Sequence, residues 1–292
     1  MELISKITDV IVPVFLIVAI GYGYARRTPT DLSTFNRIAL DVLAPLLVYS
    51  ALASKDFHLT DHVPLLVGGA VLILGSGLLA WAVAHLFGAQ PRTLVPVVMF
   101  NNCGNMGLPL ALLAFGPEHF GAAVALFAVS NLLHFSLGAR ITSSHARSRE
   151  LFLSPLMIGT ALGFVSALTD IRPPAPVLEG FKLLGDATLP MMLFALGVRL
   201  TALNKSGLSI GLLGALSRPV LGLIIALPLA WALGLEGAAK GQLLLFGALP
   251  PAVMQFMLAD RYHQEPEKVA AMIMLGNALA VVFVPLGLAI GL

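Results

Sequence analysis

The chain has 292 residues, of which 58% are hydrophobic and only 11% are charged, and its mean hydropathy is +0.93. Soluble globular proteins carry about 25% charged residues, so this composition excludes an ordinary soluble fold and predicts an all-α membrane protein. The net charge of +2 arises from basic residues in short loops, which excludes a nucleic-acid-binding stripe. The single cysteine, Cys103, excludes an internal disulfide and a Cys-based zinc site, and no metal or cofactor is predicted.

Hydrophobic runs separated by charged or Pro- and Gly-rich joints predict ten membrane-spanning helices. Each run is close to the ~20 apolar residues that cross a bilayer. The joints are short, and the central one is only a linker, so no soluble domain is expected. The predicted spans are residues 10–26, 33–53, 63–87, 93–115, 119–140, 151–169, 178–200, 206–233, 239–259 and 268–290.

Three of the charged residues inside these spans are candidate functional groups. In the second and seventh spans, Asp41 and Asp186 each precede a proline by four residues. An intramembrane carboxylate costs about 2.5–3.5 kcal/mol, so we interpret both as proton-titrating or gating candidates. The alternative is helix capping or a position nearer the membrane surface. Arg218, in the eighth span, would pair with one of them, attract an anion, or extend its charge to the membrane surface.

The fourth span is interrupted where the bilayer midplane should lie. It reads Asn-Asn-Cys-Gly-Asn-Met-Gly-Leu-Pro from Asn101 to Pro109, and this run includes Asn102, Gly104 and Asn105. Because proline removes a helical hydrogen bond and glycine loosens the turn, the helix is predicted to unwind between Gly104 and Pro109. Unwound backbone at that depth is tolerated only inside protein or beside a wet cavity.

The ninth span breaks at the corresponding place, in Phe-Gly-Ala-Leu-Pro-Pro from Phe246 to Pro251. Two broken helices at equivalent points predict a transporter's substrate site, because their free N–H groups and dipole ends suit a carboxylate. The alternative is that glycine and proline merely kink packed helices. Pro250 and Pro251 belong to this candidate site, and Gln255, one helical turn later, is placed beside it.

Two more amides and two histidines lie in or near the apolar runs. Asn131, in the fifth span, and Asn277, in the tenth, either line the same cavity or only hydrogen bond between helices. We assign His85 and His134, near predicted cytoplasmic helix ends, packing or interface roles.

The two halves of the chain repeat each other, which defines residues 1–141 and 151–292 as two five-helix units. Five is an odd number, so the second unit must enter the membrane from the opposite side and the repeats are inverted. Duplicated halves are typical of secondary transporters, whose substrate site lies where the repeats meet. The matched features, about 142–150 residues apart, are Pro13/Gly21 with Pro155/Gly163, Asp41/Pro45 with Asp186/Pro190, Trp81 with Trp231, and Asn131 with Asn277.

The distribution of basic residues predicts the orientation. One face collects ten basic residues and the other holds few, so the positive-inside rule places both termini outside the cytoplasm. The basic face comprises Arg26, Arg27, Arg92, Arg140, Arg147, Arg149, Arg199, Lys205, Arg261 and Lys268.

The run from Asn101 to Pro109 is similar to the fourth-helix motif of the auxin efflux carrier family, which is related to plant PIN-type carriers and to bile acid:sodium symporters. Pro250-Pro251 falls where that family's second crossing helix breaks. The resemblance covers essentially the whole chain and implies crossed broken helices at spans four and nine. Spans one, two, six and seven would form a scaffold that dimerises, and spans three to five and eight to ten a moving transport domain.

The same resemblance implies that Asn101, Asn102 and Asn105 bind substrate. This sequence departs from the family in three respects. It lacks the long cytoplasmic loop of many plant members, so their phosphorylation control is not implied. The second break holds no asparagine, which leaves Gln255 or Asn277 as the polar partner. No glutamate follows that break, which disfavours a sodium site.

We therefore predict an inner-membrane secondary transporter of a small organic anion that works by elevator-like alternation. The resemblance implies auxin-like or dicarboxylate substrates, such as malonate or malate. Proton coupling through Asp41 is favoured over sodium coupling. The alternative is a membrane sensor or receptor that uses a transporter fold. An intramembrane enzyme is not predicted, because no catalytic constellation is apparent in the sequence.

Overall fold

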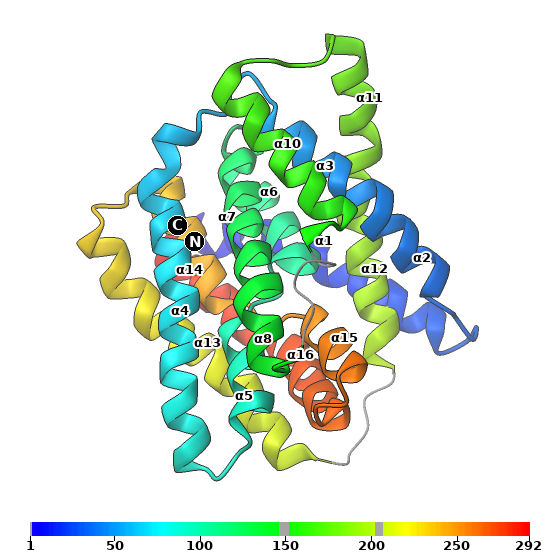
Figure 1. Ribbon diagram of the computed structural model, residues 1–292, viewed down its shortest axis with the longest axis vertical. Coiled ribbons are helices and arrows are strands. Elements are labelled where there is room, and N and C mark those ends of the chain that lie inside the picture. The colour runs from blue at the N-terminus through cyan, green and yellow to red at the C-terminus, as the bar shows by residue number, and fades with distance from the viewer. Residues whose placement is uncertain (1, 146–151, 202–206) are drawn as a thin grey trace.

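The computed structural model describes residues 2–145, 152–201 and 207–292, and in these ranges the chain is helical with no β-strand (Figure 1). Most of the predicted central linker lies outside the described residues, as do three members of the predicted basic face: Arg147, Arg149 and Lys205. Helices are the expected outcome, because a membrane-embedded backbone must satisfy its hydrogen bonds within the segment.

The first helix is α1 (Glu2–Ala25). Short π or 3₁₀ turns, labelled η, lie directly before several of the helices that follow in the first half. The first half continues with α2 (Ser33–Ile38), η1 (Ala39–Leu43), α3 (Ala44–Leu52), η2 (Leu59–His62), α4 (Val63–Leu86), α5 (Pro91–Met99), η3 (Cys103–Gly107), α6 (Leu108–Phe115), η4 (Pro117–His119), α7 (Phe120–Leu133), η5 (His134–Gly138) and α8 (Ala139–Thr142). The second half contains α10 (Pro155–Thr169), α11 (Ala175–Asp186), α12 (Thr188–Leu200), α13 (Leu208–Ala232), α14 (Gly237–Ala248), α15 (Met254–Arg261) and α16 (Pro266–Gly291).

Seven helical stretches of the described chain are long and apolar enough to cross a membrane, and Cys103–Phe115 and Pro155–Thr169 form shorter apolar helices. Large apolar side chains face outward, as at Leu86 and Trp231, which are 78% and 86% exposed. Apolar surface of this kind requires lipid or protein around it. The chain is therefore a multi-pass membrane protein.

The first helix begins earlier than the sequence indicated. The predicted span starts at residue 10, whereas α1 begins at Glu2. Lys6 and Asp9 lie in this added stretch with exposed side chains. Charged residues are compatible with helix continuation where water or headgroups reach the side chains, so hydropathy alone could not locate this boundary.

Helices distant in sequence pack side by side. α1 lies along α12, and α3 contacts α10 and α11, whereas α13 packs on α14 and α16, and α4 on α5 and α13. In Figure 1, α2, α3, α11 and α12 lie to the right and α4, α13 and α14 to the left. A Cβ on Gly21 would lie 2.2 Å from the Phe194 carbonyl oxygen, and one on Gly197 only 2.0 Å from that of Val18. The α1–α12 contact therefore depends on glycine.

Candidate substrate-binding site

The two predicted breaks lie against each other. The chain is non-helical between α5 and η3 and again between α14 and α15, and the two stretches pair as a short antiparallel bridge between Asn101 and Pro251. This pairing satisfies backbone groups that the broken helices leave open. Two backbone hydrogen bonds flank it: Asn102 N–H donates to the Pro250 carbonyl at 2.8 Å, and Ala252 N–H to the Phe100 carbonyl at 3.0 Å.

The first break lies earlier than predicted. We expected unwinding between Gly104 and Pro109, but the chain winds again from Cys103 as the π turn η3, which continues directly into α6. Pro109 is the second residue of α6. The π turn immediately before this proline is wide, and in it the Leu108 N–H donates to the Cys103 carbonyl. The helix therefore continues through Pro109 without a second break.

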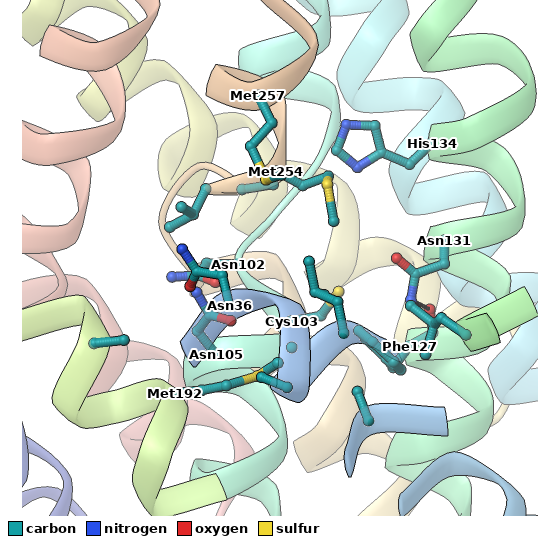
Figure 2. Close-up of a pocket in the computed structure, with 18 of the residues that line it drawn as sticks. Asn36, Asn102, Cys103, Asn105, Phe127, Asn131, His134, Met192, Met254 and Met257 are labelled. Carbon is teal, nitrogen blue, oxygen red and sulfur yellow. Dashed lines mark hydrogen bonds between the residues drawn. The ribbon is translucent and has the colours of Figure 1, made fainter. Parts of the chain in front are cut away.

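A cavity of about 80 Å³ lies beside the crossing (Figure 2). On one side it is bounded by α2, η1, α3, α10 and α12, and on the other by both breaks, η3, α7, η5 and α15. Its lining contains no carboxylate among the described residues. The polar lining residues are Asn36, Asn101, Asn102, Cys103, Asn105, Ser130, Asn131, His134 and Arg199.

All three π turns of the described chain border this cavity. η1 contributes Ala39 and Leu40, η3 contributes Cys103, Gly104 and Asn105, and η5 contributes His134. A π turn widens the helix locally and re-aims its side chains, and such turns are frequent at functional sites. Their concentration here supports the assignment of the cavity as the site.

The asparagine side chains predicted as ligands differ in the hydrogen bonds that they form within the protein. Asn101 Nδ2 donates to the Phe246 carbonyl at 2.6 Å, and Asn102 Nδ2 to Asn277 Oδ1 at 2.8 Å, and all three of these asparagines are buried. Asn105 is partly exposed, and its side chain forms no hydrogen bond with the described residues. Figure 2 shows Asn102 and Asn105 on one side of the cavity and Asn131 on the other.

Five polar lining residues were not identified as site residues from the sequence: Asn36, Cys103, Ser130, His134 and Arg199. Arg199 Nη2 donates to Asn36 Oδ1 at 2.9 Å, and both side chains line the cavity. We counted Arg199 only as part of the basic face and did not single out Asn36. Their location at the ends of predicted spans was a usable signal, but pairing α2 with α12 required the tertiary structure.

Several predicted residues support the cavity without lining it. Gln255 is fully buried, and its Oε1 lies 3.0 Å from His134 Nε2 while its Nε2 donates to Thr142 Oγ1 at 2.9 Å. Asn277 holds Asn102 in place. Pro109, Pro250 and Pro251 are also buried behind the lining residues. His134, which we assigned a packing role, lines the cavity, whereas His85 is exposed.

The predicted charged residues lie outside the cavity. Asp41 is exposed, and its side chain forms no ion pair or hydrogen bond with the described residues. Asp186 pairs with Lys182 at 3.0 Å on the surface. Arg218 is fully buried, and its Nη2 donates to the Phe246 carbonyl at 3.1 Å. The suggested pairing of Arg218 with an aspartate is therefore wrong, because α13 packs with α14 and α16, away from η1 and α11.

Comparison with known proteins agrees with this architecture. Residues 6–146 and 139–288 match the family described as "Membrane transport protein". The chain is 24% identical to a "Putative malonate transporter" of Rhizobium meliloti over 95% of this chain and 93% of that protein. It is also 24% identical to an uncharacterized transporter of Methanocaldococcus jannaschii over 95% and 96% of the two chains.

A plant protein also matches part of the chain. "Auxin efflux carrier component 1" of Arabidopsis thaliana is 27% identical over 128 residues, which cover 42% of this chain and 20% of that protein. The family and these relatives are transporters rather than enzymes. With the family match extending across nearly the whole sequence, the chain belongs to the membrane transport protein family that includes the auxin efflux carriers.

Proposed function

We propose that this protein is a secondary transporter of small organic anions. The observation that carries the proposal is the composition of the cavity. Five asparagines and the Arg199 guanidinium line it, and no carboxylate does among the described residues. Amide N–H groups and a guanidinium donate hydrogen bonds to carboxylate oxygens, and a guanidinium can do so with two parallel bonds. A cavity without competing carboxylates favours an anion over a cation.

The proposed substrate class is a small carboxylate, with dicarboxylates first. A relative that matches this chain over 93% of its own length carries the name "Putative malonate transporter". The cavity holds several polar groups on opposite sides, which suits a ligand with an anionic group at each end (Figure 2). Auxin-like carboxylates are the second candidate class, because the plant relative is named an auxin efflux carrier component.

We further propose ten spans arranged as two inverted repeats, 1–141 and 151–292, that operate by elevator-type alternation. α1, α3, α10, α11 and α12 contact one another and correspond to the expected scaffold. The two breaks, with α4, α7, α13 and α16, correspond to the expected transport domain. The cavity lies between these groups, where sliding of one against the other would carry a bound anion across the membrane.

Orientation and assembly follow from the same proposal. In this orientation the protein lies in the cytoplasmic (inner) membrane with both termini on the non-cytoplasmic side. Arg199 would then lie toward the cytoplasm, and the cavity would open to the cytoplasmic side. The exposed apolar faces of the scaffold helices would form a homodimer. Coupling to protons is proposed over coupling to sodium, because the sequence after the second break lacks the glutamate expected of a sodium site.

Transport of radiolabelled malonate into proteoliposomes tests this function. We expect saturable uptake by the wild type and a loss of affinity of about tenfold or more in Arg199→Gln, because a charge-assisted hydrogen bond is worth about 1.5–3 kcal/mol. Arg26→Gln, which removes an exposed arginine of the same basic face, should retain uptake.

The outcomes separate the two candidate functions. Failure of every mono- and dicarboxylate in a panel to bind the purified protein would contradict the anion-transporter proposal. Binding without uptake or exchange in either direction would favour the sensor or receptor alternative.

A further inference from the structure

His134 occupies a place that a packing residue would not need. It lies at the start of the π turn η5, it is buried to 3% exposure, and its ring borders the cavity (Figure 2). The ring stacks flat on Phe100, the residue that opens the first break, with centroids 4.1 Å apart and planes 3° apart. Its Nε2 contacts Gln255 on α15, just after the second break. One side chain therefore contacts elements from both broken helices.

A chain of hydrogen bonds determines which ring nitrogen carries the proton. The Gly138 carbonyl can only accept, so Thr142 Oγ1 donates to it, at 3.0 Å. Thr142 Oγ1 must then accept from Gln255 Nε2, which turns Gln255 Oε1 toward His134. An amide oxygen accepts only, so His134 Nε2 must carry a hydrogen in the neutral ring.

This arrangement leaves Nδ1 as the only titratable position of the ring. Nδ1 forms no hydrogen bond with the described residues, and Figure 2 shows one ring nitrogen of His134 turned toward Met254 and the cavity. In the neutral ring, Nδ1 presents a lone pair, which repels a carboxylate oxygen. In the protonated ring it presents an N–H, which donates to that oxygen with the help of the positive charge.

We propose that His134 is a ligand of the transported anion and couples its binding to a proton, which deepens the anion-transporter function proposed above and rests on it. A proton from solution adds to Nδ1, and the resulting N–H donates to a substrate carboxylate; no other bond forms or breaks. The parallel Phe100 ring offers its negative face to the imidazolium. Proton uptake and anion binding are thereby linked in one site.

The charged groups around His134 leave the substrate as its natural counter-ion. The other ionisable lining residues are Arg199 on α12 and the Cys103 thiol in η3. Adjacent elements carry Arg92 on α5, Arg140 on α8 and Asp260 with Arg261 on α15, and these side chains are exposed. None of the interactions shown by the described residues joins a carboxylate to the ring.

The test is the number of protons taken up when malonate binds, measured by titration calorimetry in two buffers of different protonation enthalpy. The wild type should take up about one proton above the ring's titration range, and its affinity there should fall by about tenfold per pH unit. His134→Gln should take up none and show a flatter pH dependence. Ionisation of malonate itself is common to both proteins and cancels in the comparison.

His85→Gln is the matched control, because His85 is exposed and its ring bonds only to its own helix, at the Trp81 carbonyl. It should behave as the wild type. Gln255→Met should keep the fold but remove the acceptor that fixes the neutral His134 ring with its hydrogen on Nε2. The neutral ring could then carry its hydrogen on Nδ1, which would reduce the proton uptake without removing the imidazole. Nitrogen-15 NMR of histidine-labelled wild type should show His134 as Nε2–H when neutral, a readout that requires no ligand.

The outcomes distinguish this inference from the function on which it rests. Malonate binding without proton uptake, equal uptake in the wild type and His134→Gln, or a neutral Nδ1–H ring would overturn the role of His134 alone. If no carboxylate in the panel binds the wild type, the anion-transporter function fails and this inference fails with it.

Discussion

Asn102 and Asn277 join the first broken helix to α16 through a 2.8 Å hydrogen bond between their side-chain amides. The two residues come from opposite halves of the chain, and both are buried. The Asn102 backbone also donates to Pro250 in the second break. A single residue thus connects three elements of the crossing, whereas Asn105, one turn away, has its amide available to a ligand.

This difference predicts distinct results for two alanine substitutions. Asn105→Ala should lower malonate affinity by about tenfold and leave thermal unfolding unchanged, because it removes a ligand contact only. Asn102→Ala should also lower the free energy of unfolding by about 0.5–1.5 kcal/mol, because Asn277 loses its partner. Titration calorimetry and thermal unfolding of both variants check this, and equal stability losses would contradict the assignment.

Arg218 should prove dispensable for folding. Its Nε and Nη1 atoms are buried without a hydrogen-bond partner in the described structure, and the carbonyl of Phe246 that it contacts also accepts from Asn101. Replacing a buried charge by an apolar side chain of similar size is often neutral or stabilises by about 1–4 kcal/mol. We expect Arg218→Met to unfold at or above the wild-type temperature.

Transport provides the second measurement for this variant. Because Arg218 contributes a permanent positive charge behind Asn101, its loss should weaken anion affinity even though Arg218 does not line the cavity. A large loss of stability in Arg218→Met would contradict the expectation that the residue is dispensable for folding. Unchanged malonate affinity would contradict its effect on anion binding.

Gly21 and Gly23 on α1 form a matched pair for testing the α1–α12 contact. A Cβ on Gly21 would lie 2.2 Å from a backbone oxygen of α12, whereas one on Gly23 would meet nothing within 4 Å. Gly21→Ala should therefore destabilise the protein by about 1–3 kcal/mol through overpacking. Gly23→Ala should be neutral or stabilise by about 0.5–1 kcal/mol, because alanine favours helix. Thermal unfolding in detergent distinguishes them, and similar effects would mean that the helices pack differently.

Asp41 is the residue that the sequence favoured for proton coupling. Its side chain is exposed and does not line the cavity, so we now expect Asp41→Asn to leave the pH dependence of malonate uptake unchanged. Asp186→Asn, at the equivalent place in the other half, should behave in the same way. A flattened pH profile in Asp41→Asn alone would return the coupling role to Asp41.

The sequence by itself determined the features that depend on local composition. Long apolar runs predicted membrane helices, and Gly, Pro and Asn within two of these runs predicted the paired breaks, because helix-breaking is a property of a few adjacent residues. Asn101, Asn102, Asn105 and Asn131 line one cavity, and their role as substrate ligands stays a prediction. The exact position of the first break was missed, since a π turn rewinds the chain from Cys103.

The tertiary structure alone decided which face each polar residue presents. Helices that are apolar on nearly every side carry little periodic signal, so the sequence could not show that Asp41 points outward while Arg199, Asn36 and His134 point inward. These three residues lie on different helices, and only helix packing brings them to one cavity. The identity of the ionisable groups that line the cavity was therefore decided by long-range contacts, because burial and orientation are set by neighbours distant in the chain.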